Sequence, residues 1–180
     1  NGGKITVTAP AAGQTNRLTI KARAIYVSTN SSIDVSGTGR MGWQNTNSNQ
    51  RAGGSHGGRG ASYNGVMSGD VYGDYREPVD LGDGPRYSTS YRGGGSMYLE
   101  ADELVLDGAL KADALYAYDN GGAGGSIWVN VGVLKGAGSM SARGGISGYY
   151  YYPSGGGGRI AVYYSETNGF NLSRVTAKGD

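Results

Sequence analysis

The chain has one histidine, His56, which lies in the glycine-rich segment GGSHGGRG, residues 53–60. A histidine beside a serine, with Arg59 close behind, suggests acid–base or nucleophilic catalysis. Such catalysis needs a carboxylate to hold the imidazole, but the acidic residue nearest in sequence, Asp70, is far along the chain. Neighbouring side chains on an extended chain also diverge, so adjacency alone does not pair Ser55 with His56. We therefore expect His56 and Arg59 to order the loop, with His56 hydrogen-bonded to loop backbone.

Acidic side chains are dense in the segment SGDVYGDYREPVDLGDG, residues 68–84. Carboxylate oxygens at this density make calcium the one cofactor candidate, with the ligands Asp70, Asp74, Asp80 and Asp83. Their spacing matches neither the EF-hand loop nor the calcium-binding nonapeptide repeat. The alternative is a solvated loop in which these aspartates make turns and pair with Arg76 or Arg86. A carboxylate pair for polysaccharide cleavage is a further alternative, but nothing in the sequence selects two of the acids.

Tyrosine is the residue type that most suggests binding, because the chain has 15 tyrosines and one phenylalanine. A tyrosine offers a flat apolar ring and a hydroxyl, which suits stacking on sugars and contacts with proteins. The alternative is that the rings wedge the loops onto the rest of the fold. The candidate binding residues are Tyr116, Tyr118, Tyr149, Tyr150, Tyr151 and Tyr152.

Composition limits the remaining classes of function. The 180 residues include 36 glycines and no cysteine, and the 16 basic and 14 acidic residues give a net charge of +2. The charges are scattered, so nucleic-acid binding has no electrostatic support, and without cysteine there is no disulfide or thiolate metal site. No apolar run is long enough for a membrane span, and no glycine run has the lysine and following helix of a phosphate loop. The chain starts at asparagine, so we expect a piece of a longer protein.

A repeat organises the strands that must carry these loops. Three segments each begin with a glycine cluster, followed by an alternating strand, a second apolar pair and a third short strand; their first strands start at Met97, Ile127 and Ile160. These starts recur at a nearly even interval, residues 17–39 keep the same order, and GGKITVTAP near the start resembles the tail of another copy. Alternation predicts these inward positions: Met97, Leu99, Ala101, Ile127, Val129, Val131, Ile160, Val162 and Tyr164, with Tyr98 outside.

Three short strands in each repeat of this length predict an all-β fold, a right-handed parallel β-helix (a solenoid) with long glycine-rich loop insertions. We expect one domain over residues 1–180, with coils at about 1–39 and 93–180 and a loop insertion at about 40–96. This insertion and two shorter loops, 116–125 and 146–158, are expected to pack together on one side. The alternative is an antiparallel β-sandwich, with Asp83-Gly84 or Asp107-Gly108 as hairpin turns.

The order of the glycine motifs resembles a known group of proteins. The segments GGSHGGRG, YGDYREPVDLGDG, RGGGSMYLEADELVLDGALKAD, GGAGGSIWVNVGVLKGAGSMSARGG and GGGGRIAVYY together cover most of residues 50–164. They resemble the glycine-rich parallel β-helix modules of large secreted and surface, adhesin-like proteins of bacteria. The resemblance implies an extracellular, structural or adhesive role. The tyrosine run GYYYYP departs from the pattern of that group.

These observations predict a non-enzymatic, extracellular module that forms a rigid stalk, fibre or filament at the cell surface. Its expected partners are other copies of the chain or neighbouring repeats, because open coils leave unpaired strand edges at both ends. The alternative functions are a carbohydrate-binding module that uses the tyrosine-rich loops and, with less support, a polysaccharide-degrading enzyme.

Overall fold

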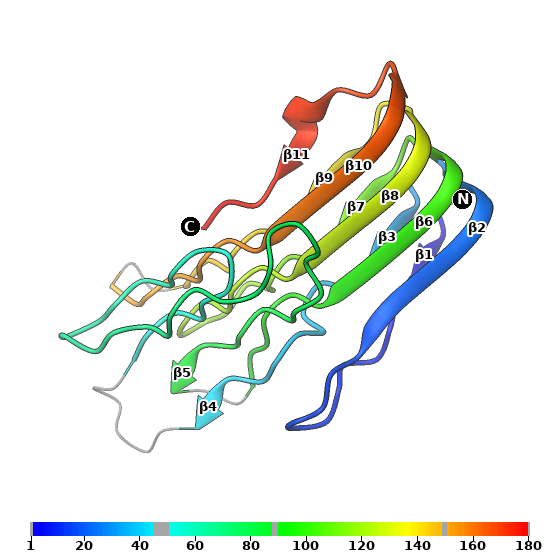
Figure 1. Cartoon of the computed structure of the whole chain (residues 1–180). Coiled ribbons are helices and arrows are strands. Elements are labelled where there is room, and N and C mark those ends of the chain that lie inside the picture. Colours follow the sequence, from blue (N-terminus) through cyan, green and yellow to red (C-terminus); the bar gives the residue numbers. More distant parts are fainter. Residues whose placement is uncertain (1, 45–50, 88–89, 149–150, 180) are drawn as a thin grey trace.

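The computed structural model describes residues 2–44, 51–87, 90–148 and 151–179. Two parallel β-sheets form one half of the molecule (Figure 1). One sheet holds four long strands in the order β10-β8-β6-β2; they are β2 (Arg17–Val27), β6 (Ser96–Leu106), β8 (Ser126–Lys135) and β10 (Arg159–Asn168). The other sheet has the order β1-β3-β7-β9-β11, with the short strands β1 (Lys4–Ile5), β3 (Ser32–Asp34), β7 (Ala109–Lys111), β9 (Ser139–Ser141) and β11 (Val175–Thr176). The remaining elements are a pair of two-residue strands, β4 (Trp43–Gln44) and β5 (Arg86–Tyr87), and a 3₁₀ turn, Leu172–Arg174. The predicted all-β class is confirmed.

All pairs among these strands of the described residues are parallel, so the antiparallel sandwich is wrong. The chain alternates between the sheets: each long strand is followed by a short strand of the other sheet. Asp107-Gly108 therefore joins β6 to β7 across the two sheets and is not a hairpin turn. Asp83-Gly84 lies outside both sheets, just before β5.

The four long strands bend at the same place. One residue of each strand drops out of the pairing register there; these residues are Arg23, Asp102, Gly132 and Ser165. On β6 the buried positions Leu99 and Leu104 lie on either side of the bend, which resets the alternation of inward and outward side chains. Two of the three short strands predicted for each repeat are therefore the two halves of one bent strand. Figure 1 shows these strands side by side with their bends aligned.

The core lies between the two sheets, and most of the predicted inward positions are buried there. Met97, Leu99, Ile127 and Val129 are fully buried. Tyr164 is an exception, with 37% of its surface exposed, because β10 is an edge strand with no further layer over it among the described residues.

Tyr98 points outward as predicted but is only 8% exposed. Its ring packs on the ring of Trp128, the facing residue of β8, with the centroids 4.5 Å apart. Outward aromatic side chains of neighbouring strands thus cover one another.

Glycine segments form the other half of the molecule and lie side by side without being strands. The N–H of Gly94 donates to the carbonyl of Ala123 over 2.8 Å, and that of Gly124 donates to Gly156 over 3.0 Å. A Cβ added at Gly57 would lie 2.0 Å from the carbonyl oxygen of Gly158, too close for any side chain. The glycine content thus follows from backbones that touch directly.

The three glycine-rich loops pack together, as the sequence predicts. Gly54 of the long insertion donates to the carbonyl of Gly121 over 2.9 Å, and Ala61 donates to Ser154 over 2.9 Å. The two shorter loops are joined by a 2.8 Å bond from Gly148 to Ala117.

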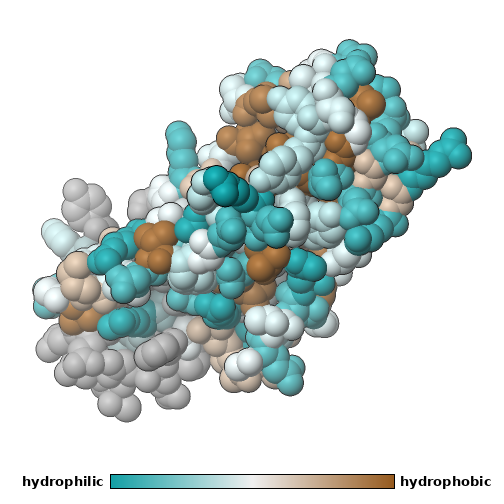
Figure 2. All heavy atoms as spheres, viewed as in Figure 1, coloured by the Kyte–Doolittle hydropathy of each residue, from teal (hydrophilic) through white to brown (hydrophobic). Residues whose placement is uncertain are grey.

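The surface shown in Figure 2 mixes hydrophobic and hydrophilic residues, with the hydrophobic ones in separate patches. Across the described ranges of the chain, no helix is long and apolar enough to cross a membrane.

Candidate functional site

His56 is fully buried where the insertion meets the glycine run that precedes β8. Its Nδ1 lies 2.8 Å from the carbonyl oxygen of Gly124; since a carbonyl only accepts, Nδ1 carries the proton. The backbone N–H of His56 donates to Gly58, and its carbonyl accepts from Tyr72, both over 3.1 Å. The expected bonding of His56 to backbone is therefore present, and it joins three segments of the chain.

A set of polar side chains surrounds His56. The centre of the Tyr72 ring lies 5.0 Å from that of the imidazole and 4.9 Å from the guanidinium of Arg40. Arg40 also contacts the carboxylates of Asp83, at 3.1 Å, and Asp80, at 3.7 Å. The Tyr72 hydroxyl donates to the carbonyl of Leu81 over 2.6 Å. Arg40, His56, Tyr72, Asp80 and Asp83 are called the insertion-base cluster below.

Burial sets the protonation states of the two rings in the insertion-base cluster. It lowers the pKa of His56, so the imidazole is neutral near pH 7. Burial, together with the charge of Asp83, raises the pKa of the Tyr72 hydroxyl above its ordinary value. The cluster therefore holds two neutral rings beside a charged arginine and two aspartates.

The geometry around His56 does not present a nucleophile to it. Ser55 donates its hydroxyl hydrogen to the carbonyl of Gly69 over 2.7 Å and accepts from the N–H of Gly60 over 3.1 Å. The Nε2 of His56 has no hydrogen-bond partner among the described residues, but the whole side chain is buried away from solvent. The arrangement fastens the insertion onto the glycine runs.

The four aspartates proposed as calcium ligands lie in three separate places in the structure. Asp70 pairs with Arg59, whose side chain is 52% exposed, and Asp74 accepts a 2.7 Å bond from the backbone N–H of Arg76. Asp80 and Asp83 share Arg40, so among the described residues these aspartates form ion pairs with Arg59 and Arg40 and not with the expected side chains of Arg76 and Arg86. Within the described part of the chain, no three histidine, aspartate or glutamate side chains are grouped so that they could hold a metal ion.

Some tyrosines of the loops pack around a buried arginine, Arg51. Its guanidinium lies 3.9 Å from the centre of the Tyr152 ring and 4.1 Å from that of Tyr87, and it pairs with Asp119 at 3.4 Å. Tyr63 meets Tyr152 edge to face, with centroids 5.8 Å apart. Tyr152, a predicted binding residue, thus lies in the contact between loops.

Other tyrosines of the loops face solvent. The exposed fractions are 65% for Tyr116, 56% for Tyr118 and 78% for Tyr151. Tyr116 lines a shallow pocket of about 180 Å³ together with Asp113, Arg143 and Ile146. The two remaining predicted binding residues, Tyr149 and Tyr150, lie outside the described residues.

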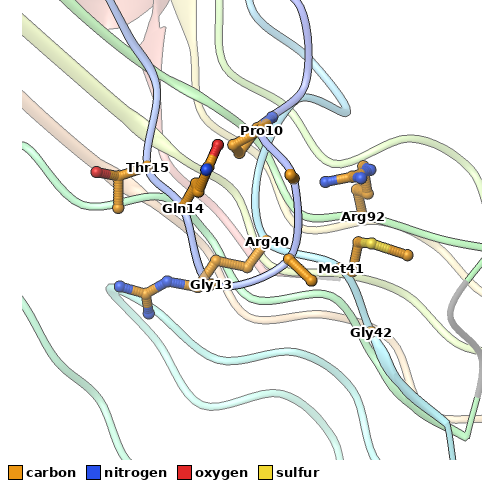
Figure 3. A pocket seen from close by; sticks show the side chains of 10 residues that line it. Pro10, Gly13, Gln14, Thr15, Arg40, Met41, Gly42 and Arg92 are labelled. Atoms are coloured by element: carbon orange, nitrogen blue, oxygen red, sulfur yellow. The ribbon is translucent and has the colours of Figure 1, made fainter.

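A pocket of about 360 Å³ lies between the loop that precedes β2 and the start of the insertion (Figure 3). It is lined by Pro10, residues 11–15, Arg40, Met41, Gly42 and Arg92. The two arginines point to different sides of it, and each already has a protein partner: Arg40 pairs with Asp83, and Arg92 donates to the carbonyl of Gly39 over 3.0 Å. The pocket therefore offers no pair of converging cations.

A polar groove of about 540 Å³ follows the bend across the long strands, and sequence reasoning missed it. Glu100 lines it and is held by Lys21, at 2.9 Å, and by the Tyr98 hydroxyl, at 2.5 Å. These two donors lower the pKa of Glu100, which keeps it ionised. One sequence signal could have revealed this groove: polar residues occupy the same position in three repeats, Lys21, Glu100 and Asn130.

Comparison of the chain with protein-family models, with curated proteins and with solved structures finds no match.

Proposed function

We propose that the chain is a structural module of an extracellular surface protein, built as a right-handed parallel β-helix that serves as a rigid stalk, fibre or adhesive segment. In this proposal each long strand, its bend and the following short strand make one layer. Layers stack through parallel ladders, so the module continues wherever another strand can pair.

The observation that carries the proposal is the repetition of one pairing register. Ser96 of β6 pairs with Ser126 of β8, which pairs with Arg159 of β10, and the bend residues stay aligned throughout. Stacked, identical layers give an elongated and stiff unit, as in other repeat proteins. The order of the glycine motifs supports the extracellular setting.

Both ends of the long-strand sheet, as far as the chain is described, have free edges, on β2 and on β10. Free edges pair with other chains unless they are covered, which supports partners that extend the stack. Light scattering and electron microscopy of the purified chain across a wide range of concentration test this. Oligomers or filaments are expected, and a monomer at every concentration would reject the assembling form of the proposal.

A carbohydrate-binding role is a second candidate, favoured by the pocket beside Tyr116. An exposed ring next to Arg143 and the carboxylate of Asp113 combines a stacking platform with polar groups, as sugar sites do. A glycan array tests this role. Binding that is lost in Tyr116→Ala and kept in Tyr26→Ala, a tyrosine 70% exposed on β2, would support it, whereas no bound glycan would end it.

A further inference from the structure

The outer face of the short-strand sheet carries a positively charged side chain on each of three neighbouring strands or just after them. They are Lys111 at the end of β7, Arg143 shortly after β9 and Lys178 shortly after β11, and all three are exposed. Neighbouring strands of a sheet lie about 4.8 Å apart, so the three cations follow one another across the sheet. Lys111, Arg143 and Lys178 are called the cationic strip below.

Backbone hydrogen bonds continue the pairing beyond the ends of the short strands and fix the register of the cationic strip. The N–H of Ala114 donates to the carbonyl of Arg143, and the N–H of Gly144 donates to that of Lys178, both over 2.9 Å. Asp113, Arg143 and Lys178 therefore occupy one equivalent position along the sheet.

The alternation of buried and exposed residues turns the cationic strip away from the core. Leu110 and Ala112, on either side of Lys111, are fully buried, and so is Ala142, which precedes Arg143. Side chains alternate between the two faces of an extended chain, so Lys111 and Arg143 point outward.

The cationic strip has an excess of positive charge. None of its three side chains forms an ion pair with a described residue. Asp113 is the acid of the same row, and its carboxylate accepts from the Ser141 hydroxyl over 2.8 Å and from the backbone N–H of Arg143 over 2.7 Å. Both oxygens of Asp113 are thus bonded to neutral donors, and its single charge balances only one of the three cations.

An exposed aromatic ring lies beside the cationic strip. Arg143 and Tyr116 both line the pocket of about 180 Å³, and 65% of the Tyr116 surface is exposed. A guanidinium can bind a carboxylate through two N–H groups at once, and a tyrosine ring offers a flat apolar surface for a sugar. One charged sugar unit can therefore be bound by both side chains.

We propose that the cationic strip binds an anionic polysaccharide that runs across the short strands. One charged sugar is held by Arg143 and Tyr116, and further charges of the same molecule lie at Lys111 and Lys178. A row of cations is complementary to a polymer that carries repeated negative charges. This inference rests on the carbohydrate-binding role given above as the second candidate function, and it names the class of glycan.

Two other kinds of polyanion fit the cationic strip less well. An acidic peptide that binds as an added strand needs a free sheet edge, but β7 and β9 are each paired on both sides. Nucleic-acid binding draws on many phosphate contacts, whereas the strip offers three cations on a chain of net charge +2. A glycan on this face also leaves the edges of the long-strand sheet free, so it does not compete with assembly through them.

Three forms of one polymer test the requirement for charge: dextran, carboxymethyl dextran and dextran sulfate of equal chain length. In titration calorimetry at low salt, the charged forms should bind the whole chain about tenfold more tightly than dextran does, and added salt should reduce the difference because the contacts are exposed. At equal charge, the tighter of the two charged forms identifies the preferred anionic group as a carboxylate or a sulfate.

Two variants of the same residue type locate the site. Arg143→Gln removes an exposed charge that has no ion pair among the described residues and keeps the backbone bond to Asp113, so the fold should persist while affinity for the charged dextrans falls several-fold. Arg23→Gln removes the same charge from an exposed position at the bend of β2, in the other sheet, and should leave this affinity unchanged. Tyr116→Ala should lower the affinity as Arg143→Gln does, because the two side chains line one pocket.

Equal binding of dextran and its charged forms would overturn the inference, as would equal losses of affinity in Arg143→Gln and Arg23→Gln. Single-stranded DNA that binds through Arg143 more tightly than both charged dextrans would also overturn it and would assign the strip to nucleic acid. Equal binding of all three dextrans that is lost in Tyr116→Ala would reject only the anionic ligand and keep the carbohydrate-binding role. If neither the dextrans nor any glycan of the array bound, both would be rejected.

Discussion

The two halves of this molecule are held together by opposite means. In the sheets, side chains such as Leu104 and Leu134 fill the space between the layers and are fully buried. In the glycine segments there is no such space: a Cβ added at Gly125 would lie 1.8 Å from the carbonyl oxygen of Gly95. One half is stabilised by buried apolar surface, and the other by hydrogen bonds between backbones in contact. Removing methyl groups should therefore destabilise the sheets, whereas adding one should destabilise the glycine segments.

The largest effect is expected when side-chain volume is removed from the sheets. Leu104→Ala leaves a cavity in the centre of β6, and such changes cost about 2–5 kcal/mol of unfolding free energy. Val105→Ala, the next residue of the same strand, faces outward and is half-buried, so it should cost far less. Denaturant melts of both variants measure the difference. Equal losses would show that the core does not lie between the sheets.

Adding a methyl group to a closely packed glycine should destabilise the glycine segments. Gly57→Ala places a Cβ against the carbonyl of Gly158, and overpacking of this kind costs about 1–3 kcal/mol. Gly69→Ala is the matched control, because its Cβ would meet only the Ser55 side chain, at 3.9 Å. Thermal melts and hydrogen exchange of the insertion compare the two. If Gly57→Ala were as stable as Gly69→Ala, direct contact between backbones would not be what holds this half.

The insertion should loosen in mild acid, whereas the sheets should not. The pKa of His56 is lowered from 6.5 by burial, so the unfolded chain binds a proton more readily than the folded chain does. The stability from neutral His56 is complete above about pH 6.5 and is lost as the pH falls toward the lowered pKa, by at most about 1.4 kcal/mol per pH unit.

Unfolding free energy measured against pH tests this dependence, with His56→Gln as the comparison. The variant should lose the slope in that window. The carboxylates Glu100 and Glu103, whose pKa values lie below 4.5, titrate in more acidic solution and do not interfere. A slope that persists in His56→Gln would assign it to another group.

The smallest effect is expected on the outer face of the sheets. Lys21→Gln removes the ion pair with Glu100, but both side chains are well exposed, at 61% and 42%. Exposed pairs contribute little and are screened by salt. At low salt the melting temperature of Lys21→Gln should be slightly below that of the parent. At high salt the two melting temperatures should be equal. A large loss at high salt would show that the outer face contributes as much as the core.

The β-strands of the two parallel sheets were largely predicted from the sequence because their signal is local. Alternating residues such as Ile127 and Val129 mark inward positions, and a repeat fixes which strands are neighbours. The bend itself was not predicted: Arg23, Asp102, Gly132 and Ser165 share a position but no residue type. The exposure of Tyr164 was missed because a repeat does not show that β10 lies at the edge of its sheet among the described residues.

The loops were harder to predict because their contacts link distant residues of unrelated types. Nothing near Arg40 in sequence points to Asp80 and Asp83, and nothing near Arg51 points to Tyr152. His56 was expected to bond loop backbone, but its acceptor, Gly124, is 68 residues away. Glycine content indicated close packing without saying which backbones meet.

The insertion also sets an order in which the molecule must assemble. Ser96 pairs with Ser126, and Ser126 with Arg159, each a single repeat further along the chain, but Arg17 must find Ser96 across the whole insertion. Each doubling of a loop adds about 0.6 kcal/mol of closure entropy, and distant pairings form more slowly. We expect β6, β8 and β10 to nucleate folding and β2 to dock last. Until β2 docks, the edge of β6 is unpaired in a newly made chain. Pairing of this edge with a wrong strand is most probable during that interval.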